Sequence, residues 1–218
     1  GLWALLVTKV IPGEDVTIEY KPKHLDRHFI EQSPSVAIGQ AKEEIIRMGA
    51  FSIQGMNESY EYLKTGNKKH AETGYQIEDA INNLDCKITD YLIEISSVSI
   101  SPLESERHVM LMETVRDIER IGDHFENIIE LIDYRDVNKV KLTEDAMEDL
   151  AEMFTLTIET VQKAVDSLDL NDMDLARTVA HREDLIDKME RKFRNNHILR
   201  LNEGSFPAQE GVVLFACV

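Results

Sequence analysis

The sequence predicts an all-α protein, and three observations support this class. Breakers are scarce, because the 218 residues include only 10 glycines and 5 prolines, most of them between stretches of helical periodicity. Apolar residues recur at spacings of three and four, and no useful length alternates with period two. Two pairs, Ser33-Pro34 and Ser101-Pro102, carry the cap-plus-proline signature of a helix start.

Five long helices are expected in order along the chain. The first opens at Pro34, and a glycine follows both the first and the fifth helix. Ser101-Pro102 opens the third, Thr143 caps the fourth, and Asn171-Asp172 opens the fifth. The predicted bounds are 34–64, 69–96, 102–134, 143–168 and 171–203. After the fifth helix a new apolar segment, 211–218, begins.

The N-terminal residues 1–11 are apolar and include a tryptophan. Spanning a bilayer takes about 20 apolar residues, so this stretch cannot span one alone. It fits either the exit end of a membrane helix that begins outside the sequence or a short apolar staple on the bundle. Residues 12–32 show no helical period and contain Pro12, Gly13 and Pro22, so we expect a linker there.

An internal repeat becomes visible when the chain is shifted by 105 residues. Three apolar residues of the first helix, Ala41, Ile45 and Met48, then fall on Ala146, Leu150 and Met153. The block 78–82 likewise falls on 183–187. We therefore predict tandem antiparallel three-helix bundles, residues 33–136 and 141–218. The second bundle would lack most of its last helix, which either lies outside the sequence or is supplied by another chain.

The charge balance restricts the partners. With 41 acidic and 24 basic residues the formal charge is −17, a field that repels nucleic acid and attracts cations. Two cysteines, Cys86 and Cys217, suggest neither a disulfide framework nor a cysteine-based zinc site, and they favour a reducing compartment. The sequence offers no nucleophile with an adjacent base and no phosphate-binding glycine loop, so we do not expect an enzyme.

The third predicted helix carries the most informative pattern. Its apolar seam is spaced four and three residues apart: Leu111, Val115, Ile118, Gly122, Phe125, Ile129 and Ile132. An acidic stripe runs one residue further on: Glu119, Asp123, Glu126, Glu130 and Asp133. Since one residue turns a helix by about 100°, the stripe borders the buried seam. Carboxylates four residues apart repel one another and need a cation, a basic partner or water beside them.

The same relation between seam and acids recurs on two other predicted helices. One step from the seam lie Glu78, Asn82 and Asp85 in the second helix, and Glu183, Asp187 and Glu190 in the fifth. Two explanations stay open. The stripes could form a site for hard cations, which prefer oxygen ligands, or they could be a solvated flank that duplication has copied.

A family resemblance is carried by residues 116–130, Arg-Asp-Ile-Glu-Arg-Ile-Gly-Asp-His-Phe-Glu-Asn-Ile-Ile-Glu, which resemble the signature helix of PhoU-domain proteins. The centre of this signature is the Glu-x-x-x-Asp motif at 119–123. Blocks 78–82 and 183–187 are similar to the second-helix motif of the same family. The resemblance covers roughly residues 35–216 and is specific in combination with the 105-residue repeat.

The N-terminal part narrows the subfamily. Residues 6–14, a mixed-charge linker and residues 33–49 are similar to one particular junction in bacterial sodium/phosphate cotransporters. This junction joins the last membrane helix to the PhoU-like tail. The resemblance implies a location at the cytoplasmic face of the membrane, as part of a transporter, and a role in phosphate transport or its control. The membrane domain would be the partner, and a homodimer is a further option.

The resemblance also implies metal binding, because carboxylate motifs hold multinuclear metal clusters in some members of the family. The expected metal ligands are Glu78, Glu119 and Asp123 in one site, with Glu183 and Asp187 as a weaker half-site. Asn82 stands where a carboxylate is expected, which removes one negative charge from the first site. A divalent or trivalent ion is expected, and the choice among iron, zinc, magnesium and calcium stays open.

Two alternatives from other functional classes remain. One is a metal-free helical adaptor. The other is a di-metal carboxylate enzyme in a helical bundle, whose sites usually include Glu-x-x-His. No glutamate in this sequence is followed three residues later by histidine, which weighs against the enzyme.

Overall fold

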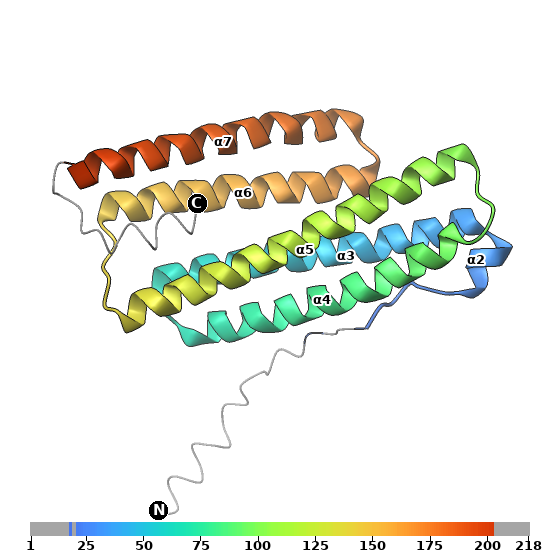
Figure 1. The fold of residues 1–218 in the computed structure, drawn as a ribbon, viewed down its shortest axis with the longest axis horizontal. Coiled ribbons are helices and arrows are strands. Elements are labelled where there is room, and N and C mark those ends of the chain that lie inside the picture. The colour runs from blue at the N-terminus through green and yellow to red at the C-terminus, as the bar shows by residue number, and fades with distance from the viewer. Residues whose placement is uncertain (1–17, 19–20, 203–218) are drawn as a thin grey trace, which may run out of the picture.

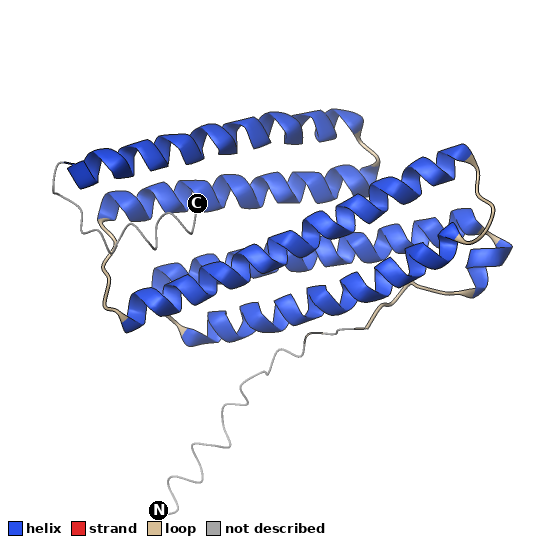
Figure 2. Ribbon diagram, in the orientation of Figure 1, coloured by secondary structure: helices blue, strands red, loops and turns tan. Residues whose placement is uncertain are grey.

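The structure is a computed structural model that describes residue 18 and residues 21–202. All regular structure in this part of the chain is helical (Figures 1 and 2). The helices are α2 (His28–Gln32), α3 (Pro34–Thr65), α4 (Lys68–Ser96), α5 (Pro102–Val137), α6 (Glu144–Leu170) and α7 (Met173–Asn202). The predicted all-α class is confirmed, and the five predicted long helices correspond to α3–α7.

Local signals in the sequence explain where the helices begin and end. Ser101 and Glu104 form a capping box at the start of α5, in which each side chain accepts a hydrogen bond from the other residue's backbone N–H. Gly66 follows α3 with a φ of 66°, a left-handed conformation that glycine adopts without strain. Asn171 ends α6 in the same left-handed region, with a φ of 51°.

Helices α3, α4 and α5 pack against one another as the first three-helix bundle (Figure 1). Close contacts at glycines determine how they fit together. Gly55 of α3 lies against the ring of Phe125 of α5, and Gly74 of α4 lies against Ile129, so a larger side chain has no room at either glycine. Ile81 in the same core is fully buried.

The second unit contains α6 and α7, which pack side by side. α6 also packs against α3, whereas α7 lies on the outer side of α6, away from the first bundle (Figure 1). The α3–α6 contact is tight, since a Cβ atom on Gly49 would lie 2.7 Å from Val165. Tyr60 and Phe154 stack across the same contact with ring centroids 5.0 Å apart.

Residues 21–32, which we call the N-terminal strap, lie against the first bundle. The carboxylate of Glu44 on α3 is completely buried and accepts hydrogen bonds from the backbone N–H groups of Lys23 and His24. Arg47 forms an ion pair with Glu44 at 3.4 Å and also donates to the carbonyl of Lys21 at 2.8 Å. The buried charge therefore has a basic partner and two backbone donors.

Further along the strap, α3 and α4 both hold its backbone. The hydroxyl of Tyr91 donates to the carbonyl of Asp26 and to Oε1 of Gln40, both at 2.9 Å. Arg27 pairs with Glu94 at 3.0 Å, and Ile30 of α2 is buried. The predicted linker 12–32 is therefore docked on the bundle in its second half, and it includes a helical turn that the sequence pattern did not indicate.

Within the described residues, no helix is both long and apolar enough to cross a membrane. The predicted membrane-helix end or staple at 1–11 lies outside the described residues. The same is true of the apolar segment at 211–218.

Candidate metal site

The register between α4 and α5 decides which acidic residues meet. The two helices are antiparallel neighbours, and a Cβ on Gly122 would lie 3.4 Å from Ile81. Glu78 precedes Ile81 by about one turn, so it lies opposite α5 residues about one turn after Gly122. Oxygen atoms of Glu78, Asp123 and Glu126 all lie within 4.8 Å of one another.

The three carboxylates differ in exposure. The Glu78 residue is only 6% exposed, Glu126 is half-buried and Asp123 is exposed. The amide of Asn82 donates a hydrogen bond to Oε1 of Glu78 and orients that carboxylate. The cluster is therefore anchored at the edge of the core and open to solvent on the side of Asp123.

Burial and mutual repulsion make the cluster electrostatically unfavourable. Burial raises the pKa of Glu78, and the negative charge of Glu126 raises it further, while the hydrogen bond from Asn82 opposes the shift. The pKa of Glu126 is raised by burial and then by Glu130 and Asp123. Among the described residues, no ion pair to Glu78, Asp123 or Glu126 relieves this repulsion. A cation placed among the oxygens of these three carboxylates would relieve the repulsion.

Glu119 lies on the same border but does not join the group of three. Its pKa is raised by burial, then by the charges of Asp123 and Asp85. The pKa of Asp85 is also raised by burial, although a hydrogen bond from Thr89 and the positive charge of Arg116 oppose the shift. These carboxylates extend the cluster into an acidic row along the α4–α5 border: Asp85, Glu119, Asp123, Glu78 and Glu126.

At the other end of the α4–α5 border, the basic side chain of Lys68 pairs with Asp133. Nζ of Lys68 lies 2.8 Å from Oδ1 of Asp133, and the hydroxyl of Tyr62 donates to the same oxygen. Although burial opposes it, these two hydrogen bonds lower the pKa of Asp133. Asp133 is thus neutralised by its neighbours, in contrast to the acidic row.

The comparison with known families decides the assignment. The PhoU domain profile matches residues 45–132 and 150–216, more than half of the chain. The chain belongs to the PhoU domain family. Its fold agrees with that of a solved relative, the crystal structure of PhoU from Pseudomonas aeruginosa, with a TM-score of 0.76. That match has 17% sequence identity and covers 82% of this chain and 85% of the other.

Curated relatives fall into two groups. The phosphate-specific transport system accessory protein PhoU homolog 1 of Thermotoga maritima is 28% identical over 173 residues, which cover 79% of this chain and 74% of that protein. The putative inorganic phosphate export protein YjbB of Salmonella typhimurium is 22% identical over 204 residues. Those residues are 93% of this chain and 37% of the export protein, so the chain spans about a third of that longer relative.

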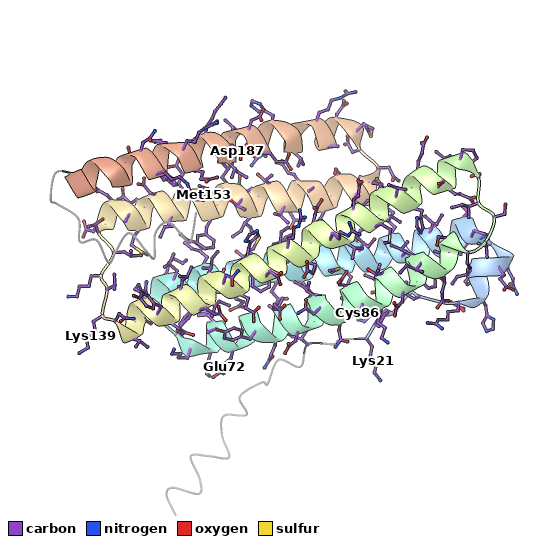
Figure 3. All side chains as sticks on the ribbon, in the orientation of Figure 1. Lys21, Glu72, Cys86, Lys139, Met153 and Asp187 are labelled. Atoms are coloured by element: carbon purple, nitrogen blue, oxygen red, sulfur yellow. The ribbon has the colours of Figure 1, made fainter. Side chains whose placement is uncertain are left out.

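The second predicted site is less complete in this PhoU-family chain. Glu183 and Asp187 are both exposed on α7, where Figure 3 labels Asp187. Within the described part of the chain, neither of them belongs to a group of three potential ligands. The half-site remains a prediction.

Glu126 is the member of the three-carboxylate cluster that the sequence analysis did not include among the expected ligands. It lies in the acidic stripe of α5, three residues after Asp123, so the two share one helix face. The helical spacing in the sequence therefore already placed Glu126 beside Asp123. What the sequence could not supply was the α4–α5 register, which places Glu78 beside Glu126 and Glu119 beside Asp85.

The donor set at the three-carboxylate cluster suits a hard cation. Carboxylate oxygens from two helices are the kind of ligands that Mg²⁺, Ca²⁺ or Mn²⁺ prefers. Iron in helical bundles also uses inward carboxylates. The side open to solvent at Asp123 leaves room for water to complete the coordination.

Proposed function

We propose that this PhoU-family chain is a regulatory module of phosphate transport that binds a metal ion between α4 and α5. The observation that carries the metal site is the convergence of Glu78, Asp123 and Glu126 oxygens within 4.8 Å. The raised pKa values of Glu78 and Glu126 support it, because uncompensated negative charge is the condition that a cation relieves.

The link to phosphate transport rests on the relatives, which are named as accessory proteins of phosphate-specific transport or as phosphate export proteins. A match to about a third of a longer export protein supports a module that works with a membrane domain at its cytoplasmic face. The resemblance of the N-terminal residues to sodium/phosphate cotransporters supports a sodium-dependent transporter as the partner. Metal occupancy would screen the acidic row and stiffen the α4–α5 pair, which is how ion binding would reach the partner.

The metal site is tested by thermal melts and titration calorimetry on protein stripped with a chelator and checked by elemental analysis. Mg²⁺, Ca²⁺, Mn²⁺, Zn²⁺ and iron are added separately. At about 100 times its dissociation constant, a bound ion stabilises by about 2.7 kcal/mol, which raises the unfolding temperature of a chain of this size by roughly 5–10 °C.

Variants locate the ion. Glu78→Gln and Glu126→Gln should each remove most of the metal-dependent rise, whereas Glu113→Gln, an exposed change on α5 away from the row, should keep it. Binding that survives in both Glu78→Gln and Glu126→Gln would place the ion elsewhere. If no ion binds at millimolar concentration, the metal-free adaptor is the correct description.

The role in transport needs its own test. In the native host, the double variant Glu78→Gln/Glu126→Gln should change phosphate uptake relative to Glu113→Gln at equal protein levels. Unaltered uptake together with lost metal binding would separate the two parts of the proposal. Oxygen consumption by the iron-loaded protein would instead support the di-metal enzyme.

A further inference from the structure

An open hollow lies at the end of the first bundle where the α3–α4 turn meets the connection from α5 to α6 (Figure 1). Its volume is about 450 Å³, and three basic side chains line it, those of Lys64, Arg135 and Lys141. Among the described residues that line the hollow, Asp136 is the one acid. The lining is therefore mainly cationic, although the whole chain contains 41 acidic and only 24 basic residues.

The guanidinium group of Arg135 is fixed in place beside the hollow. Its Nη1 donates to the carbonyl of Leu63 at 3.1 Å, and its Nε donates to Oδ1 of Asp136 at 2.9 Å. Its Nη2 lies 2.9 Å from the same oxygen, and the side chain is only 14% exposed. A guanidinium has five N–H donors, so these three contacts leave two donors without a partner among the described residues. Largely buried donors of this kind require an acceptor.

Lys141 and Lys64 add positive charge that can turn toward a ligand. Lys141 is exposed, and within the described part of the chain no hydrogen bond or ion pair engages its ammonium group. Lys64 pairs with Glu61 at 2.5 Å, and these two side chains are 39% and 42% exposed. Exposed ion pairs contribute little to stability, so Lys64 can exchange Glu61 for another anion at small cost.

Nearby acids do not cancel the charge of the hollow. Asp136 is already engaged by Arg135, and Glu144 and Asp145, which begin α6, do not line the hollow. At physiological ionic strength, exposed charges more than about 8 Å apart are largely screened from one another. The lining residues therefore determine the local potential, and the net charge of −17 has little influence there.

We propose that this hollow binds a phosphoryl group, either as inorganic phosphate or as part of a small phosphorylated molecule. Arginine presents paired N–H donors to phosphate oxygens, and lysine adds a compact positive charge. The volume of about 450 Å³ lies in the usual range for small-molecule sites and exceeds what the free ion needs. Such a site lets the module respond to the anion whose transport it regulates, and this last step rests on the function proposed above.

A bound anion would also affect how the two units are joined. Lys141 belongs to the connection that leads to α6, whereas Lys64 and Arg135 belong to helices of the first bundle. Met147 of α6 lines the same hollow. An anion that contacts Lys141 and Arg135 together therefore favours one placement of the start of α6 relative to the first bundle.

Nuclear magnetic resonance tests the site on the isotopically labelled full chain in the presence of EDTA. Inorganic phosphate, glycerol phosphate and chloride are added separately at matched ionic strength. Amide resonances of Gly66, Lys141 and Leu142 should shift with a phosphate compound and not with chloride, while those of α7 stay unchanged. Saturation by inorganic phosphate identifies the free ion as the ligand, and saturation by glycerol phosphate alone identifies a phosphorylated molecule. No saturable shift with either compound up to roughly 10 mM would overturn the proposal.

Variants locate the phosphoryl group. Arg135→Gln and Lys141→Gln should each weaken its binding about tenfold or more, because a hydrogen bond to a charged group is lost. Lys141→Gln changes only an exposed side chain, so it remains informative if Arg135→Gln, which gives up the bond to Leu63, destabilises the fold. The matched control is Lys139→Gln, which removes the same charge from an exposed residue that does not line the hollow (Figure 3). Equal losses in Lys139→Gln and Lys141→Gln would show diffuse attraction and overturn the proposal.

Failure of this site and failure of the metal site are distinguishable. Because EDTA removes free metal, phosphate binding is measured independently of the acidic row. Glu78→Gln should keep phosphate binding, and Lys141→Gln should keep the metal-dependent rise in unfolding temperature. Loss of phosphate binding in Glu78→Gln would place the anion at the acidic row and overturn the assignment to the hollow.

Discussion

The first bundle and the α6–α7 pair carry the same repeated pattern but differ in how completely it is buried. Ile77 is fully buried in the first bundle, whereas its equivalent is Arg182, whose side chain pairs with Glu159 at 3.1 Å. Glu78 is 6% exposed between α4 and α5, whereas its equivalent Glu183 is exposed. Duplication copies the helical periodicity, but a packing partner decides whether a position becomes core, part of a buried carboxylate cluster or solvated surface.

The largest expected effect distinguishes the two cores directly. Ile81→Ala should lower the free energy of unfolding by about 2–5 kcal/mol, since it leaves a cavity in a closed core. The equivalent change Ile186→Ala should cost about 1 kcal/mol or less, because the half-buried side chain borders an open groove. Urea denaturation at equal protein concentration measures both. Equal losses at the two positions would show that the second core is as closed as the first.

A smaller effect concerns the N-terminal strap, a feature of the first bundle. Glu44→Ala removes the carboxylate that accepts from the backbone N–H groups of Lys23 and His24 and pairs with Arg47, at a cost of about 1–3 kcal/mol. Trypsin should then cut after Lys23 at least about tenfold faster, while the circular dichroism of the helices is retained. Glu43→Ala, the exposed neighbour, is the matched control and should leave cleavage unchanged. Similar cleavage in both variants would mean that Glu44 does not hold the strap.

The smallest effect is the pH dependence of the acidic row. The folded pKa values of Glu78, Glu119 and Glu126 are raised, so the native state binds more protons than the unfolded chain just above their ordinary value of 4.5. Stability of the metal-free protein should therefore fall as pH rises from about 4.5 toward 7, and Glu126→Gln should flatten this slope. The difference should be below about 1 kcal/mol, because solvent screens these partly exposed groups. A steeper fall in Glu126→Gln than in the parent would contradict the sign.

Sequence signals were sufficient for the five long helices, α3–α7, because their ends are locally encoded. Proline after serine, the capping box at Ser101 and the left-handed Gly66 each act within a few residues, so they can be recognised without knowing the fold. The acidic stripes were recognisable for the same reason, since they depend on helical periodicity alone.

Tertiary features could not be predicted in this way. The partnership of Glu78 with Glu126 depends on Ile81 packing against Gly122, a contact between residues 41 positions apart. Docking of the strap depends on the buried carboxylate of Glu44, which in the sequence looks like any other helix glutamate. Both depend on how helices pack, and periodicity contains no information about that.

The anchoring of Lys21–Asp26 across two helices has a mechanical consequence. A slack connector would let the bundle tumble freely with respect to anything joined to its N-terminal side. Here hydrogen bonds from Arg47 of α3 and Tyr91 of α4 hold the strap backbone at two separate points. The strap and the bundle therefore move as one rigid unit. A rotation of α3 and α4 would be passed on as torque at Lys21 instead of being absorbed by loose chain.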